Sequence, residues 1–169
     1  VPTALTTVDV VSALGVADGS LCHAPCMRPF VFVHEYVYQA RMLNPSAAAN
    51  AQIGFVYQFQ DASTYYEVVF SPRGVAQLRR VQGGVVTVEK TAAYLQGGPN
   101  LWFDVELHRR GTQTTVRVNG NTVFLNAEQA DLAGGLLGLV THNTTGRFEN
   151  VDEKGPYGTQ PVFETFDDP

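Results

Sequence analysis

The stretch NLWFDVELHRRGTQTTVRVNGNTVF, residues 100–124, carries the clearest strand signal in the chain. Between residues 101 and 108 apolar and polar side chains alternate, which is the period of a strand with one buried and one solvated face. The step Asn119-Gly120 between VRV and TVF predicts a two-residue hairpin, because both residues tolerate positive φ. The stretch therefore predicts antiparallel strands joined by tight turns. The polar face of its first strand carries Trp102, Asp104, Glu106 and His108.

The rest of the chain repeats this pattern of short strands and turns. The composition is 44% apolar, 11% aromatic and only 16% charged, with 16 Gly and 9 Pro among 169 residues. Few charges and many turn formers favour short strands over helices. Roughly ten β-branched and aromatic runs follow one another, and a helical turn is expected only around NAEQADL, residues 126–132. The residues therefore predict a single all-β domain, an antiparallel two-sheet sandwich.

Charge and hydropathy argue against a nucleic-acid partner and against a membrane-spanning helix. The net charge of −5 and the pI near 5.2 argue against a nucleic-acid partner, which requires clustered Lys and Arg. The two basic pairs, Arg79-Arg80 and Arg109-Arg110, are each expected at a solvated hairpin end. No stretch reaches the roughly 18 consecutive apolar residues of a membrane helix, so we predict no membrane span. The start VPTALTTVDVV lacks the positive charges of an intact signal peptide; it is either a mature start left by cleavage or an arbitrary boundary.

The two cysteines, Cys22 and Cys26, are separated by three residues. A zinc site needs four ligands and a thioredoxin-like motif has two intervening residues, so neither pattern fits. We favour a short local disulfide, with two free thiols as the alternative. A disulfide indicates an oxidising compartment, and the sequon Asn143-Thr144-Thr145 points the same way in a eukaryotic secreted chain. The expected location is therefore secreted or at the cell surface.

Four motifs in series resemble the concanavalin A-like lectin/glucanase superfamily, in particular its laminin-G-like and bacterial jelly-roll modules. They are IGFVYQFQDASTYYEVVF, GVAQLRRVQGG, LWFDVELHRRGTQTTVRVNGNTVF and GGLLGLVTHNTTGRFENVDE. The resemblance implies a concanavalin A-like jelly roll over residues 30–153. Residues 1–29 then form a loop-rich N-terminal part, and residues 154–169 a tail or edge strand. Members include sugar-binding modules, adhesion domains, glycosidases and lyases, so the fold does not decide the function.

The polar row of the opening stretch has three interpretations. Asp104 and Glu106 lie roughly 6.5–7 Å apart by strand rise, a separation that glycosidase carboxylates use. The glucanases of the superfamily carry Glu-x-Asp-x-x-Glu on one strand, and this strand departs from that pattern. On the neighbouring strand Arg117 can lie across from either carboxylate as an ordinary ion pair. We therefore favour a solvated sheet face, and keep a ligand-contacting face and a catalytic pair as alternatives.

A second set of residues is suggested by the sugar sites of this fold, which combine a stacking ring with amide and guanidinium donors. The alternative for each of them is a structural or solvated role. The candidate ligand contacts are Gln58, Tyr65, Arg79, His142 and Asn143.

The resemblance also implies a possible calcium ion, because laminin-G-like modules and related lectins often bind one through carboxylate and amide oxygens. Hard cations need several such oxygens in one place. Asp167 and Asp168 at the C-terminus are the candidate ligands. Our overall expectation is an extracellular, non-catalytic, carbohydrate-binding module whose partner is a glycan or polysaccharide. The alternatives are an adhesion or structural module with a protein partner, and a glycoside hydrolase or polysaccharide lyase of the same fold.

Overall fold

The computed structural model describes residues 28–29, 35–95, 98–132, 136–155 and 158–160. These residues contain no helix, and so none that is long and apolar enough to cross a membrane. The expected helical turn after residue 126 is wrong, because the strand there continues to Glu128. The strands are β1 (Arg28–Pro29), β2 (Glu35–Leu43), β3 (Gln52–Asp61), β4 (Thr64–Phe70), β5 (Val75–Gln82), β6 (Val85–Ala93), β7 (Trp102–Arg110), β8 (Gln113–Val118), β9 (Asn121–Glu128), β10 (Leu136–His142), β11 (Arg147–Gly155) and β12 (Gly158–Gln160).

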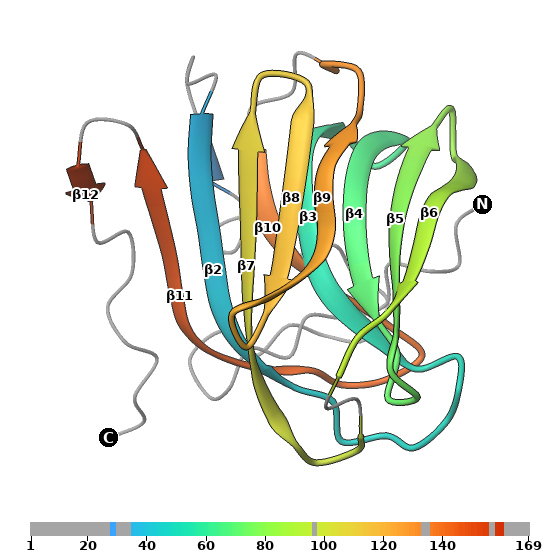
Figure 1. The fold of residues 1–169 in the computed structure, drawn as a ribbon. Coiled ribbons are helices and arrows are strands. Elements are labelled where there is room, and N and C mark those ends of the chain that lie inside the picture. The colour runs from blue at the N-terminus through green and yellow to red at the C-terminus, as the bar shows by residue number, and fades with distance from the viewer. Residues whose placement is uncertain (1–27, 30–34, 96–97, 133–135, 156–157, 161–169) are drawn as a thin grey trace.

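These strands form two antiparallel sheets that pack face to face (Figure 1). Sheet A has the order β1-β10-β3-β4-β5-β6, and sheet B has the order β12-β11-β2-β7-β8-β9. The meanders β3 to β6 and β7 to β9 lie in different sheets, while β10 and β11 return to pair with β3 and β2. Such returns from one sheet to the other make a jelly roll. The two-sheet antiparallel sandwich expected from the sequence is confirmed.

The hairpin expected at Asn119-Gly120 is present between β8 and β9. The φ angles of Asn119 and Gly120 are 48° and 79°, as a type I′ turn requires. Asn119 also ties this turn to the preceding strand: its backbone N–H donates to the carbonyl of Asp104 at 2.8 Å, and its Oδ1 accepts from the N–H of Asp104 at 2.8 Å. The turn therefore holds the backbone of β7 at the position that carries Asp104.

The space between the sheets is filled by aromatic and aliphatic side chains. Tyr38 of β2 lies over Phe55 of β3 with ring centroids 4.3 Å apart, which joins the two sheets directly. At one end of the core Phe70, Tyr94 and Phe103 form a three-ring cluster with centroids 5.3 to 5.7 Å apart. Offset and edge contacts of this kind stabilise aromatic pairs beyond their burial. The alternation expected for β7 is confirmed, because its core residues are Phe103, Val105 and Leu107.

Phe59 of β3 lies on the face of sheet A opposite to the one that simple alternation predicts. Simple alternation groups Phe59 with Ile53, Phe55 and Tyr57, but Phe59 belongs to a separate apolar cluster on the second face of sheet A. The reason is a bulge at Gln58, whose φ is 48°, with a register shift after Tyr57. An extra residue in one strand reverses the direction of every side chain that follows.

Arg109 corrects a second expectation. It is not at a solvated hairpin end but is 1% exposed, on the same face of β7 as Leu107. Its guanidinium donates to Thr114 Oγ1 and to the carbonyl of Gln129, both at 2.8 Å, and lies 5.8 Å from the ring centre of Tyr66. These contacts compensate the two terminal nitrogens of a buried cation, while its Nε has no acceptor among the described residues. They also hold the loop after β9 against the core.

The second face of sheet A is buried as well. The side chains that face away from sheet B on β3, β4 and β10 include Val56, Val69 and Val140, and all three are fully buried. These central strands present no open surface there to a ligand, whereas β5 and β6 of the same sheet carry half-buried and exposed side chains. The second face of sheet B is different, because its strands alternate between buried and half-buried or exposed side chains.

Several sequence-based predictions lie outside the described residues. These are the disulfide between Cys22 and Cys26, the calcium ligands Asp167 and Asp168, and the tail after Gln160, whereas β12 within the tail lies at the edge of sheet B. They remain predictions.

Candidate functional site

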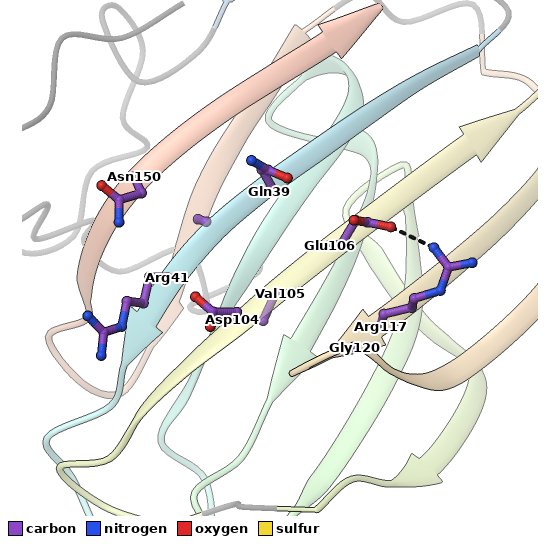
Figure 2. Close-up of a pocket in the computed structure, with 9 residues that line it drawn as sticks. Gln39, Arg41, Asp104, Val105, Glu106, Arg117, Gly120 and Asn150 are labelled. Atoms are coloured by element: carbon purple, nitrogen blue, oxygen red, sulfur yellow. Dashed lines mark hydrogen bonds and ion pairs between the residues drawn. The ribbon is translucent and has the colours of Figure 1, made fainter. Parts of the chain in front are cut away.

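A hollow of about 370 Å³ opens on the outer face of sheet B, across β2, β7, β8 and β11. Figure 2 shows that its polar side chains come from four strands and project to the same side. It contains both carboxylates of the polar row singled out in the sequence. Its lining residues are Gln39, Ala40, Arg41, Asp104, Val105, Glu106, Arg117, Gly120 and Asn150.

The register of the strands explains this arrangement. On β2, Gln39 lies opposite Glu106 and Arg41 lies opposite Asp104. On β8, Arg117 lies opposite Glu106 on the other side. Cross-strand neighbours have Cβ atoms about 4.5–5.5 Å apart, so their polar ends meet on one face. Acceptors and donors therefore alternate across three adjacent strands.

Two ion pairs account for most of the charge in the hollow. Arg117 donates to Glu106 at 2.6 Å, and both side chains are little more than one-third exposed. Arg41 lies 3.7 Å from Glu149. Among the residues that the structure describes, no cation bonds the carboxylate of Asp104, although Arg41 is its neighbour in the register. Asp104 is therefore the acceptor that the hollow leaves open.

Trp102 serves the hollow indirectly. The guanidinium carbon of Arg41 lies 5.3 Å from the centre of the Trp102 ring, within the range of a cation–π contact. In Figure 2 the side chain of Arg41 extends along β2, away from the Asp104 carboxylate. Trp102 and Glu149 together hold Arg41 in this position, so one face of the indole is already in use.

We expect Asn119→Ala to lower the free energy of unfolding by about 1–2 kcal/mol. Alanine at positive φ is strained, and the hydrogen bond to the N–H of Asp104 is lost. Urea unfolding followed by circular dichroism measures the change. Asn119→Gly removes the strain and isolates the hydrogen bond, whereas Asn119→Asp keeps an acceptor at a residue that tolerates positive φ. A wild-type midpoint for Asn119→Ala would contradict the role given to this turn.

The structure brings two of the predicted ligand contacts together, on the second face of sheet A. His142 and Arg79 both bond Glu67, at 2.9 Å and 3.2 Å, and Arg79 also donates to Gln52 at 2.7 Å. Burial alone would raise the pKa of the Glu67 carboxyl. The hydrogen bond and charge of His142 and the guanidinium of Arg79 outweigh burial, so the pKa of Glu67 is lowered.

Glu67 was missed at the level of sequence. Alternation places it beside Tyr65 and Val69, but its partner His142 lies 75 positions away on β10. Pairing between β3 and both of its neighbours, β4 and β10, is what brings the two residues together. No local pattern could have shown this contact.

The other predicted ligand contacts do not form one site. Tyr65 shares the face of Arg79 but is buried, and this burial raises the pKa of its hydroxyl. Gln58 is used within the fold, where it bonds Asp131 at 3.1 Å and the N–H of Leu132 at 3.0 Å. Asn143 is exposed beyond the end of β10 and donates to the carbonyl of Asn50. Tyr65 and His142 are both buried, so neither side chain is open to a ligand.

The described residues contain no cluster of acidic, His or Cys side chains of the kind that holds a metal ion. Within them no three His, Cys, Asp or Glu side chains lie close enough to hold one. Asp167 and Asp168, the candidate ligands of the calcium ion that the family resemblance implies, lie outside the described residues.

No family model matches the sequence, and no curated protein matches it. Solved structures do match. The carbohydrate binding module CBM66 from Bacillus subtilis is similar with a TM-score of 0.57 and 12% identity, over 72% of this chain and 77% of that chain. Sheep galectin-11 is similar with a TM-score of 0.62 and 14% identity, over 79% of this chain and 99% of the galectin chain. The GH43 protein BlXynB from Bacillus licheniformis is similar with a TM-score of 0.52 and 10% identity, over 68% of this chain and 27% of that chain.

At identities this low the similarity shows a shared fold alone. Which ligand binds depends on this chain's own side chains. The match to the GH43 protein covers about a quarter of that chain, so most of that protein has no counterpart here. The match to the galectin covers nearly all of it. With two antiparallel sheets and these structural neighbours, the chain has the concanavalin A-like jelly-roll fold.

Proposed function

We propose that this protein is an extracellular, lectin-like module that binds a carbohydrate in the hollow on sheet B. The observation that carries the proposal is the hollow itself, whose donors and acceptors stand on four strands of one sheet. The structural similarity to a carbohydrate binding module and to galectins supports the same class of ligand. The exposed position of the sequon residue Asn143 supports an extracellular location.

The chemistry of the hollow suits a sugar. Each sugar hydroxyl can donate one hydrogen bond and accept others, so a matching site needs both kinds of partner. Asp104 supplies acceptor oxygens, Arg41 and Arg117 supply donors, and the amides of Gln39 and Asn150 supply both. Side chains held by strands and by ion pairs lose little freedom when a ligand arrives, which favours affinity.

The same geometry favours binding over catalysis. A glycosidase places two carboxylates on opposite sides of one glycosidic bond. Here the carboxylate of Glu106 is engaged by Arg117 at 2.6 Å, and Asp104 projects from the same face of the same strand. The row therefore offers one open carboxylate rather than a facing pair.

The test is a glycan array, followed by calorimetric titration of the best ligand. We expect Arg117→Ala to weaken binding by about tenfold or more, the loss of one charged hydrogen bond. Arg110→Ala, an exposed arginine at the end of the same sheet that does not line the hollow, is the matched control and keeps wild-type affinity.

Other outcomes would overturn the proposal in different ways. A loss of binding in Arg79→Ala but not in Arg117→Ala would move the site to sheet A. Retention on a protein ligand, with no glycan bound, would favour an adhesion module. Release of reducing ends or unsaturated products that stops in Asp104→Asn would indicate an enzyme.

A further inference from the structure

We infer that the hollow on sheet B selects neutral or amino sugars and discriminates against anionic sugars such as uronates, with the Asp104 carboxylate as the selecting group. This inference rests on the proposed function and adds the charge of the ligand to it. The reason is that both arginines of the hollow are already paired with a glutamate, whereas Asp104 is not paired with a cation of the described residues.

The charges around the hollow do not cancel. Arg117 is matched by Glu106, and Arg41 is matched by Glu149. With Asp104 added, the carboxylates among these residues outnumber the guanidinium groups. A bound anion would therefore meet net negative charge, even though two arginines line the site.

Asp104 is placed to meet the ligand first. It is exposed, it lines the hollow, and no cation bonds it among the residues that the structure describes. Asn119 fixes its backbone through two hydrogen bonds of 2.8 Å, so the Cα atom that carries this side chain keeps its position beside the hollow. A carboxylate can accept hydrogen bonds from two neighbouring hydroxyls at once, and from an ammonium group more strongly. Either contact is lost when the ligand presents a carboxylate instead.

Repulsion between Asp104 and an anionic sugar has a limited effect on affinity. Two like charges about 4 Å apart in water repel enough to change affinity about fivefold at low salt. Salt screens this repulsion, because the Debye length falls from about 30 Å at 0.01 M to about 3 Å at 1 M. Discrimination by Asp104 should therefore shrink as salt is added, whereas discrimination by shape would not.

The experiment is an array of β-linked glucose and galactose oligomers in three matched forms: neutral, 2-amino and C6-carboxylate. At low salt we expect the wild-type protein to bind the neutral form about fivefold better than the carboxylate form, and the 2-amino form at least as well as the neutral one. The ratio should approach one in 0.5 M salt. Asp104→Asn should bring the ratio of neutral to carboxylate binding at low salt to about one, and it should weaken binding of the neutral form as well, because the neutral sugar loses an acceptor.

Glu35→Gln is the matched control. It removes one carboxylate from sheet B at a site that pairs with His108 and does not line the hollow, so the preference should remain. Equal binding of neutral and carboxylate forms by the wild-type protein, or an unchanged preference in Asp104→Asn, would overturn the inference and leave carbohydrate binding intact. Binding of no form at all would overturn the proposed function itself.

Discussion

Gly54→Ala is expected to lower the free energy of unfolding by about 3 kcal/mol or more, a large share of the roughly 5–15 kcal/mol that holds a domain folded. Gly54 lies in the middle of β3, paired with Val69 on β4 and with Val140 on β10. A Cβ atom at this position would lie 1.8 Å from the carbonyl oxygen of Val68 and 2.8 Å from its carbonyl carbon. These are backbone atoms of a central ladder, so relief requires β3 and β4 to separate.

Urea unfolding measured by circular dichroism tests this expectation. The matched control is Gly98→Ala, where the added Cβ would meet the end of the Leu101 side chain at 2.9 Å. Leu101 is half-exposed and flexible, so it can move aside at a cost within about 0.5 kcal/mol. Equal midpoints for Gly54→Ala and Gly98→Ala would show that β3 and β4 are not packed as closely as described.

Glu67→Gln is expected to cost about 3 kcal/mol at neutral pH. Glu67 is 1% exposed and bonds both Arg79 and His142. Removing one partner of a buried ion pair leaves the other charge without compensation in a site shielded from water. Glu106→Gln provides the comparison: it breaks a pair that is one-third exposed on both sides, and we expect a change of about 0–1 kcal/mol.

The pH dependence gives Glu67 a signature of its own. Its pKa is lowered in the folded protein, so the stability it contributes is complete above the ordinary glutamate pKa of about 4.3. That contribution disappears as the pH falls through the lower folded pKa, when the carboxylate becomes protonated. Below pH 4.3 the wild-type protein should therefore lose stability more steeply than Glu67→Gln. Parallel curves would show that Glu67 is not held as a carboxylate in the fold.

The local rules of strand and turn explain which parts of the fold were predictable. Alternation in residues 101–108 correctly separated the core side of β7 from its polar side, and it correctly set Arg117 opposite an acid. Continued by one step, the same alternation puts Arg109 on the core side. That signal was present, but a basic pair beside a turn was interpreted as solvated. Here the buried hydrogen bonds to Thr114 and Gln129 outweigh the preference of arginine for water.

The parts that sequence could not supply depend on strand pairing over long separations. The reversal at Phe59 requires positive φ at Gln58, a residue type that gives no warning of it. The close approach at Gly54 depends on Val68 in the next strand, and the Glu67–His142 contact joins β4 to β10. The hollow likewise needs β11 to pair with β2, which places Asn150 beside residues more than 100 positions earlier in the chain.

The contact between Trp102 and Arg41 has a practical consequence. Trp102 is the only tryptophan in the chain, so the long-wavelength fluorescence of the folded protein comes from a single indole beside the hollow. A ligand that draws the Arg41 guanidinium toward itself changes the polarity at that ring, and its emission shifts. Molecules that settle on sheet A, across the core from this ring, leave the emission as it was. The fold thus contains a built-in optical reporter of occupancy for one face of the sandwich.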